Sequence, residues 1–325
     1  MRRLKLVPDT TTIDFFKYQW LTLGASVVMM IASLAVFVVM GLNFGIDFRG
    51  GTTIRSETTA PVTVAQYRAA IAPLALGDVV ISEVFDPTFA ENQHVMMIRI
   101  QAQDTEASVT PETVAAVEAA IKAVDSSVTF PSVESVGPKV SGELVQSAVI
   151  AVALSLVGIL FYVWLRFEWQ FAVGAVAALV HDVLLTIGIF SLFQIRFDLA
   201  IVAALLTIVG YSINDTVVVF DRLRENLIKF KKMPLRDVMN LSVNETLSRT
   251  IMTSGTTLIA LVALLVLGGD VIRGFVFAMT WGVVVGTYSS VFMAKNIVLY
   301  LGTKRDWTKP VAEGPAGTQF SDNGK

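Results

Sequence analysis

Six long apolar runs alternate with polar segments along the chain, and their lengths predict six membrane-spanning helices. A bilayer core of about 30 Å requires roughly 20 apolar residues in a helix. The first run covers residues 20–42, and five more, within 144–301, lie at about 144–165, 170–192, 198–220, 250–268 and 274–301. The first run is longer than the apolar core of a signal peptide, so we expect it to remain as the first span.

A polar insert of residues 43–143 separates the first two spans, and its pattern is that of a mixed α+β domain. It predicts strand 51–57, helix 63–74, strand 78–86, strand 93–101, helix 111–124 and strand 128–136. Thr63 with Gln66 has the spacing of a capping box, and Thr110 before Pro111 is typical of a helix start. The order βαββαβ predicts a ferredoxin-like sandwich.

Lysine and arginine positions orient the spans. Residues 1–19 contain Arg2, Arg3, Lys5 and Lys17, so this end is predicted to be cytoplasmic. The segment 221–249 then forms a basic cytoplasmic loop, whereas the opposite short loops hold only Arg196 and Arg273. Both termini are therefore expected in the cytoplasm and the insert outside it. The tail 302–325 is polar, with glycine and proline, which predicts disorder.

Composition supports an integral membrane protein. Of 325 residues, 54% are hydrophobic and 16% are charged, against about 25% charged in soluble domains. The net charge of -2 and the lack of a basic stripe give no reason to expect nucleic acid as a partner. The absence of cysteine excludes disulfides, thiolate metal sites and a cysteine nucleophile. We expect no cofactor, no metal and no enzymatic reaction.

Asn214 and Asp215 lie within the fourth apolar run, before the charges that begin at Asp221. At the rise of an α-helix, Asp215 lies about 8 Å inside the end of this span. Ionisable residues inside a membrane are costly and usually functional. The alternative is a structural carboxylate that pairs with a neighbouring helix.

Two further spans carry polar groups. His181 and Asp182 lie near the middle of the third span, where they form either a proton relay or a pair that fixes helix packing. The fifth span begins at Arg249 and places hydroxyl groups on one face, which either line a wet path or bond across helices: Thr250, Thr253, Ser254 and Thr257. Arg249 is expected at a depth similar to that of Asp215, or else as an interfacial anchor.

Small residues mark two other segments. The sixth span has one at every fourth position from Ala278 to Ala294, including Gly282 and Gly286, which predicts a close helix contact. The turn Gly45–Thr52 contains Asp47 and the pair Gly50-Gly51, which permits unusual backbone angles. It is either a rigid joint to the insert or an ordinary glycine turn, and it lacks the lysine of a phosphate-binding loop.

Together these segments resemble the SecF family of bacterial protein-export membrane proteins. The resemblance covers essentially the whole chain and is carried by four segments: Gly45–Thr52, His181-Asp182, Gly210–Asn226 and Ser248–Thr250. It implies half of a resistance-nodulation-division fold in the bacterial inner membrane, with SecD supplying six related spans. It also implies proton-driven assistance to a polypeptide that is leaving the SecYEG translocon, with YajC and a YidC-type insertase as further partners.

In this family, the fourth-span aspartate and the fifth-span arginine are tied to proton conduction, and these roles fall on Asp215 and Arg249. Five other polar residues of the third, fourth and fifth spans are also expected to take part in proton conduction: Asn214, His181, Asp182, Thr250 and Thr253. One alternative is a self-sufficient transporter of small solutes, although related exporters have twelve spans in one chain. Another is a structural translocon subunit without its own ion path. An intramembrane aspartyl protease is disfavoured because Asp215 lacks the glycine-flanked context of those enzymes.

Overall fold

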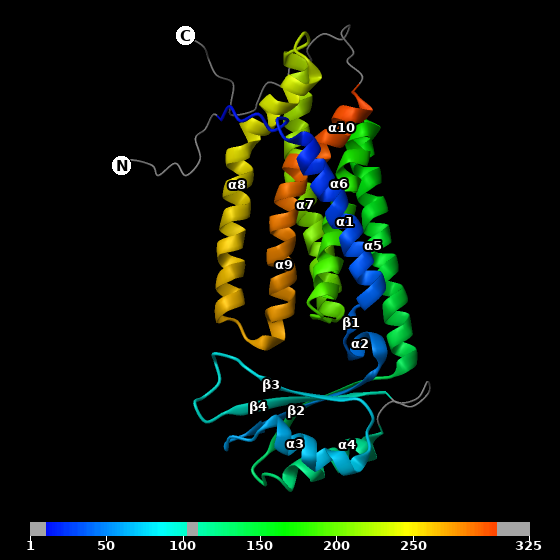
Figure 1. The fold of residues 1–325 in the computed structure, drawn as a ribbon, viewed down its shortest axis with the longest axis vertical. Helices are drawn as coiled ribbons and strands as arrows, with labels where there is room; N and C mark the ends of the chain where they lie inside the picture. The colour runs from blue at the N-terminus through cyan, green and yellow to red at the C-terminus, as the bar shows by residue number, and fades with distance from the viewer. Residues whose placement is uncertain (1–10, 103–109, 304–325) are drawn as a thin grey trace, which may run out of the picture.

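A computed structural model describes residues 11–102 and 110–303, in which a long helix bundle adjoins a smaller α+β domain (Figure 1). Arg2, Arg3, Lys5 and most of the tail 302–325 lie outside the described residues.

Among the described residues, six helical stretches are long and apolar enough to cross a membrane, which confirms the predicted number. The first four are α1 (Gln19–Met40), α5 (Pro138–Arg166), α6 (Trp169–Leu192) and α7 (Leu199–Lys229). The fifth is α8 (Leu235–Leu267). The sixth consists of α9 (Asp270–Ser289), the π-helical turn η2 (Ser290–Ala294) and α10 (Lys295–Leu301).

Most of the segment 221–249, which the sequence predicts as a loop between two spans, is helical. α7 continues to Lys229, α8 begins at Leu235, and only residues 230–234 connect them. Arg222 on α7 forms an ion pair of 2.7 Å with Glu225 on the same helix and another of 2.7 Å with Glu245 on α8, and the second pair joins the two extensions. Charged residues end an apolar run, but at helical spacing they support the helix in water.

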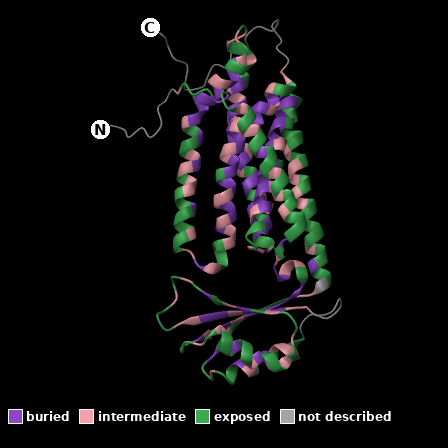
Figure 2. Ribbon diagram, viewed as in Figure 1, coloured by how far each residue is buried: buried purple, intermediate pink, exposed green. Residues whose placement is uncertain are grey.

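Burial divides the bundle into inner and outer helices (Figure 2). Within the most apolar 18 residues of each span, 61% of the residues are buried in α6, 50% in α7 and 56% in the last span. The corresponding shares are 6% in α1, 6% in α5 and 11% in α8. Polar groups on the inner helices must therefore find partners within the protein.

The small-residue face of α9 lies against α7. A Cβ atom on Gly282 would overlap the side chain of Ile208, and one on Gly286 would lie 3.0 Å from Cβ of Ser212. The close contact expected for the sixth span is thus made with α7, within this chain.

The α+β domain contains β2 (Gly51–Thr58), α3 (Val64–Ile71), η1 (Ala72–Leu74), β3 (Val79–Val84), β4 (His94–Gln101), α4 (Pro111–Lys122) and β5 (Thr129–Val136). The strands form an antiparallel sheet in the order β3-β4-β2-β5. α3 and α4 cover one face of it, with Ile54, Tyr67 and Ile121 fully buried between them, and the other face is turned toward the bundle (Figure 1). Thr63 and Gln66 form the predicted capping box.

A short joint connects the domain to the bundle. β1 (Asn43–Phe44) pairs in parallel with β6 (Arg196–Phe197), and α2 (Ile46–Arg49) follows β1. Gly51 has a φ of +138°, and a Cβ atom there would overlap the carbonyl oxygen of Ile100. The joint therefore requires glycine at this position.

Candidate functional site

A layer of polar side chains crosses the interior of the helix bundle. We refer to seven residues as the buried polar layer: His181 and Asp182 on α6, Ser212 and Asp215 on α7, Ser254 on α8, and Thr287 and Ser289 on α9. Apolar clusters lie on both sides of it, one containing Phe171 and Phe220, the other Phe190 and Ile208. The layer is thus a polar region enclosed between two apolar parts of the bundle core.

Asp182 is the best-bonded member of the layer. Its Oδ1 lies 2.9 Å from Nδ1 of His181, and its Oδ2 accepts hydrogen bonds from Ser212 Oγ at 2.6 Å and from Ser289 Oγ at 2.8 Å. His181 and Asp182 therefore bond to each other, and together they tie α6 to α7 and α9. His181 Nε2 is buried and has no hydrogen-bond partner among the described residues.

Asp215 is buried at 4% exposure but has fewer partners. Its Oδ2 accepts one side-chain hydrogen bond, from Ser254 Oγ on α8 at 3.3 Å, and Ser254 in turn accepts from Thr287 Oγ1 at 2.7 Å. A buried carboxylate with one long hydrogen bond is less well compensated than one with three. Of the two aspartates, Asp215 is thus the one whose negative charge is more costly to keep.

Arg249 does not bond to Asp215 in this structure. Its side chain is exposed, and no carboxylate in the described part of the chain lies within 4.0 Å of its guanidinium group. Thr250 Oγ1 is buried without a partner among the described residues, whereas Thr253 Oγ1 bonds to carbonyls of its own helix. The structure brings Asp215 together with Ser254, and leaves Arg249 at the edge.

Asn214 lies on α7 outside the layer. It is exposed, as are Gly210 one turn away and Thr207 two turns away. The structure therefore separates Asn214 from its neighbour Asp215, because adjacent residues on a helix point about 100° apart.

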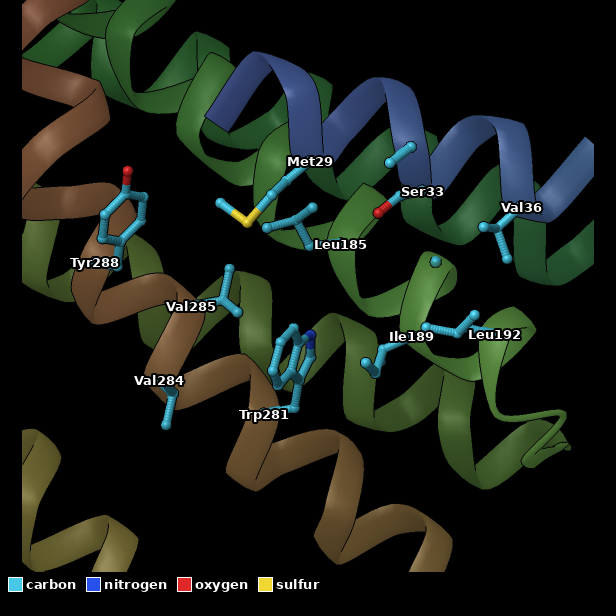
Figure 3. Close-up of a pocket in the computed structure, with 12 residues that line it drawn as sticks. Met29, Ser33, Val36, Leu185, Ile189, Leu192, Trp281, Val284, Val285 and Tyr288 are labelled. Atoms are coloured by element: carbon cyan, nitrogen blue, oxygen red, sulfur yellow. The ribbon is translucent and has the colours of Figure 1, made fainter. Parts of the chain in front are cut away.

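An apolar cavity of about 380 Å³ lies beside the layer, between α1, α6 and α9 (Figure 3). Tyr288 stands between this cavity and His181, with their rings stacked at 6.1 Å. The Tyr288 hydroxyl donates to the carbonyl of Thr22 at 2.9 Å, so it also anchors α1. The cavity is lined mainly by aliphatic side chains and Trp281, so it offers no chain of hydrogen-bonding groups.

Sequence reasoning missed Ser212, Thr287 and Ser289, because single hydroxyls are common in apolar helices. Ser212 lies three residues before Asp215, and this spacing is the signal that could have indicated it. Lys295 was also missed: it is 1% exposed, and its Nζ donates to the carbonyl of Phe15 at 3.1 Å and lies 4.1 Å from the ring centre of Phe16.

The turn Gly45–Thr52 is hydrogen-bonded to α7, the helix that carries Asp215. Oδ2 of Asp47 accepts a hydrogen bond from the backbone N–H of Leu199, the first residue of α7, at 3.0 Å. Thr52, at the start of β2, is buried and bonds to Ser135 Oγ at 2.8 Å. A second contact joins the domain to the bundle where Phe85 N–H donates to Asp270 Oδ2 at 2.7 Å.

Comparison with known proteins identifies the family. Residues 116–304 match the model of the protein export membrane protein SecD/SecF, C-terminal, and residues 35–62 match the SecD/SecF GG motif. The chain is 69% identical over 320 residues to the protein translocase subunit SecF of Cereibacter sphaeroides, with 98% of each covered. It is 41% identical over 307 residues to the protein translocase subunit SecDF of Brucella abortus, and the match covers 93% of this chain and 39% of that protein.

Solved structures agree. The crystal structure of SecDF from Thermus thermophilus, described as a translocon-associated membrane protein, has a TM-score of 0.79 at 34% identity. SecDF in its super-membrane-facing form has a TM-score of 0.67 at 35% identity. Both matches cover 91% of this chain and 39% of the SecDF chain, so this chain spans well under half of those proteins. The chain belongs to the SecF family, whose members are subunits of the Sec protein-export machinery.

Proposed function

We propose that this chain acts with SecD in the bacterial inner membrane and uses the proton-motive force to assist late steps of polypeptide export through the Sec translocon. The observation that carries the proposal is the state of Asp215. It is a buried carboxylate within a span, held by one hydrogen bond of 3.3 Å to the neighbouring helix α8. Such a group can gain or lose a proton with little loss of other bonds.

In this proposal, Asp215 carries the proton. Ser254 and Thr287 continue its hydrogen bonding across α8 and α9, and Thr250 on the same side of α8 has a buried hydroxyl with no partner among the described residues. Arg249 moves toward Asp215 when the carboxylate is ionised, since a nearby cation favours the charged form. The apolar cavity of Figure 3 has no polar chain, so the path runs on the other side of the layer, between α7 and α8, with Thr253 at its entrance.

The pair His181 and Asp182 has a second role in the proposal. Its hydrogen bonds hold α6, α7 and α9 together next to Asp215. Nε2 of His181, which has no partner in residues 11–102 and 110–303, can exchange a proton without breaking that network.

Movement of α7 then reaches the α+β domain through the bond from Leu199 to Asp47. We place this domain in the periplasm and assign it to the ferredoxin-like class, whose strand order 4-1-3-2 matches β5-β2-β4-β3. It is tied to the bundle at Asp47 and again at Asp270, so a shift between α7 and α9 would turn it. Turning the domain is how the complex would act on an emerging polypeptide.

SecD covers the outer face of α7. That face exposes Thr207, Gly210 and Asn214 at membrane depth, where an uncovered amide is unfavourable. Arg249 on α8 is exposed as well, so a partner with related spans would enclose the path. SecYEG, YajC and a YidC-type insertase are further partners under this proposal. We place both chain termini in the cytoplasm.

The test compares two aspartates of α7 in membranes with and without a proton gradient. Asp215→Asn keeps size and hydrogen bonding but cannot titrate, so gradient-dependent export should be abolished while assembly with SecD is kept. Asp221→Asn is the matched control, because Asp221 is half-exposed and pairs with Arg166 at 3.3 Å. If the Asp215→Asn protein at equal expression still responds fully to the gradient, Asp215 does not carry the proton and the role proposed for it is wrong.

A further inference from the structure

A small polar pocket lies where the α+β domain meets the helix bundle. Its volume is about 110 Å³, and its lining includes three arginines from three separate elements: Arg49 on α2, Arg99 on β4 and Arg196 on β6. These elements are far apart in the sequence, so the fold itself gathers the guanidinium groups.

The arginines are poorly neutralised. No carboxylate in residues 11–102 or 110–303 lies within 4.0 Å of the guanidinium of Arg49 or Arg99, and Arg196 Nε lies 3.8 Å from Asp198, beyond hydrogen-bond distance. Nε of Arg99 and Nε of Arg196 are both buried without a hydrogen-bond partner among the described residues. The side-chain bond that Arg99 does make goes from Nη2 to the sulfur of Met97 at 3.3 Å.

Buried N–H groups normally find an oxygen acceptor. Here the Nε atoms of two guanidinium groups of like charge have no such acceptor in the described part of the chain. Burial, and after it the positive charge of Arg196, lower the pKa of Arg99 to about 10, while Asp198 opposes the shift. Asp78 also lines the pocket, and Asp47 is already occupied by the N–H of Leu199. Three arginines against one lining aspartate leave the pocket positive and short of acceptors.

The pocket lies at the level of the membrane surface. Asn43, which lines it, follows the end of α1 at Met40, and Arg196 follows the end of α6 at Leu192. The ends of two spans mark the boundary of the hydrocarbon core, and headgroups lie just beyond it. The glycine at position 45 leaves room for the Arg196 side chain, because a Cβ atom on Gly45 would lie only 3.0 Å from Arg196 Nε.

We propose that this pocket binds a phosphate group, supplied by the headgroup of an anionic phospholipid in the leaflet next to the α+β domain. Planar guanidinium groups bind phosphate oxygens with two parallel hydrogen bonds, and the pocket holds three such groups. The bound headgroup would join α2, β4 and β6, and so fix the angle between domain and bundle. This site is separate from the buried polar layer and does not depend on the proton role.

The test uses the full chain purified together with SecD in a neutral detergent. Melting temperature is measured against added short-chain phosphatidylglycerol, short-chain phosphatidylcholine or inorganic phosphate. We expect phosphatidylglycerol to raise the melting temperature, with phosphatidylcholine weaker and inorganic phosphate weakest. In Arg99→Gln and Arg196→Gln, the phosphatidylglycerol concentration at half effect should rise about tenfold or more, as the loss of a charged hydrogen bond implies.

Arg55→Gln is the matched control, because it removes a positive charge from the same sheet but from an existing pair with Glu57 at 2.8 Å. Its half-effect concentration should equal that of the unchanged chain. Arg49→Gln, on an exposed side chain, keeps the test readable if a buried arginine variant fails to assemble. Equal lipid response in all variants would overturn the site. A response to inorganic phosphate at the same or lower concentration than phosphatidylglycerol would overturn the lipid as its source.

Discussion

The carboxylate of Asp47 holds the first backbone N–H of α7, at Leu199, across 3.0 Å. Asp198, the N-cap residue of α7, accepts from Ile201 N–H in the same first turn at 3.3 Å. The first N–H groups of a helix lack partners within the helix, so these two aspartates complete its end. The joint between domain and bundle is thereby fixed to the helix that carries Asp215.

We predict that Asp47→Ala weakens this connection. Loss of the bond should lower the free energy of unfolding by about 1 kcal/mol, as for a lost helix cap. Gradient-dependent export should fall more than assembly with SecD does, because the joint would no longer follow α7. Asp47→Asn retains a side-chain oxygen as acceptor and is the control. Equal export by all three proteins at matched levels would show that the bond does not transmit movement.

The contact between α7 and α9 can be tested with two glycines in helix interiors. Gly282→Ala places a methyl group into the side chain of Ile208, and overpacking of this kind costs about 1–3 kcal/mol. Gly255→Ala on α8 meets nothing within 4 Å, so the better helix propensity of alanine should leave stability equal or raise it by up to about 1 kcal/mol. Melting temperatures of the two purified variants decide the point. Similar values would mean that α9 can shift away from α7 at little cost.

Lys295 should hold the segment before α1 in place. Its ammonium group bonds to the carbonyl of Phe15 and lies over the ring of Phe16, and a desolvated cation–ring contact contributes about 2 kcal/mol. Lys295→Met keeps the stem but removes the charge, so this segment should be cut faster by added protease and the melting temperature should fall. Lys229→Met, at the exposed end of α7, is the control and should change neither.

Orientation can be measured directly because the chain has no cysteine. A cysteine at Asn92, exposed between β3 and β4, should react with a thiol reagent added to the periplasmic side of an intact inner membrane. A cysteine at Lys232, exposed between α7 and α8, should react only after that membrane is ruptured. The reverse pattern would invert the topology.

Sequence patterns predicted the spans well but the site only in part. Run length counts spans because the bilayer sets it, whereas the ends of α7 and α8 depend on ion pairs such as Arg222 with Glu245 that hydropathy does not register. Depth along a helix follows from residue number, so Asp215 and Arg249 could be placed at similar levels. Which way each points depends on how the helices pack, and this is why Ser254 rather than Arg249 bonds to Asp215.

The two buried aspartates should separate into a structural and a functional role. Asp182 accepts bonds from His181, Ser212 and Ser289, and each hydrogen bond to a charged group contributes about 1.5–3 kcal/mol. Asp182→Asn turns one carboxylate oxygen into a donor that faces hydroxyls and an imidazole, so it should lower the melting temperature and the yield of assembled complex. Asp215 has a single bond of 3.3 Å, so Asp215→Asn should melt close to the unchanged chain.

Gradient-dependent export should be affected in the opposite order, with Asp215→Asn losing more activity than Asp182→Asn. In membranes adjusted to equal amounts of assembled complex, Asp182→Asn should retain part of the gradient-dependent export, because Asp215 can still titrate. Asp215→Asn should retain none, and Asp215→Glu should retain part. Arg249→Lys should fail less completely than Arg249→Met, since the charge persists without the planar guanidinium group. If Asp182→Asn is stable but uncoupled while Asp215→Asn still responds to the gradient, the proton is carried by the pair of His181 and Asp182.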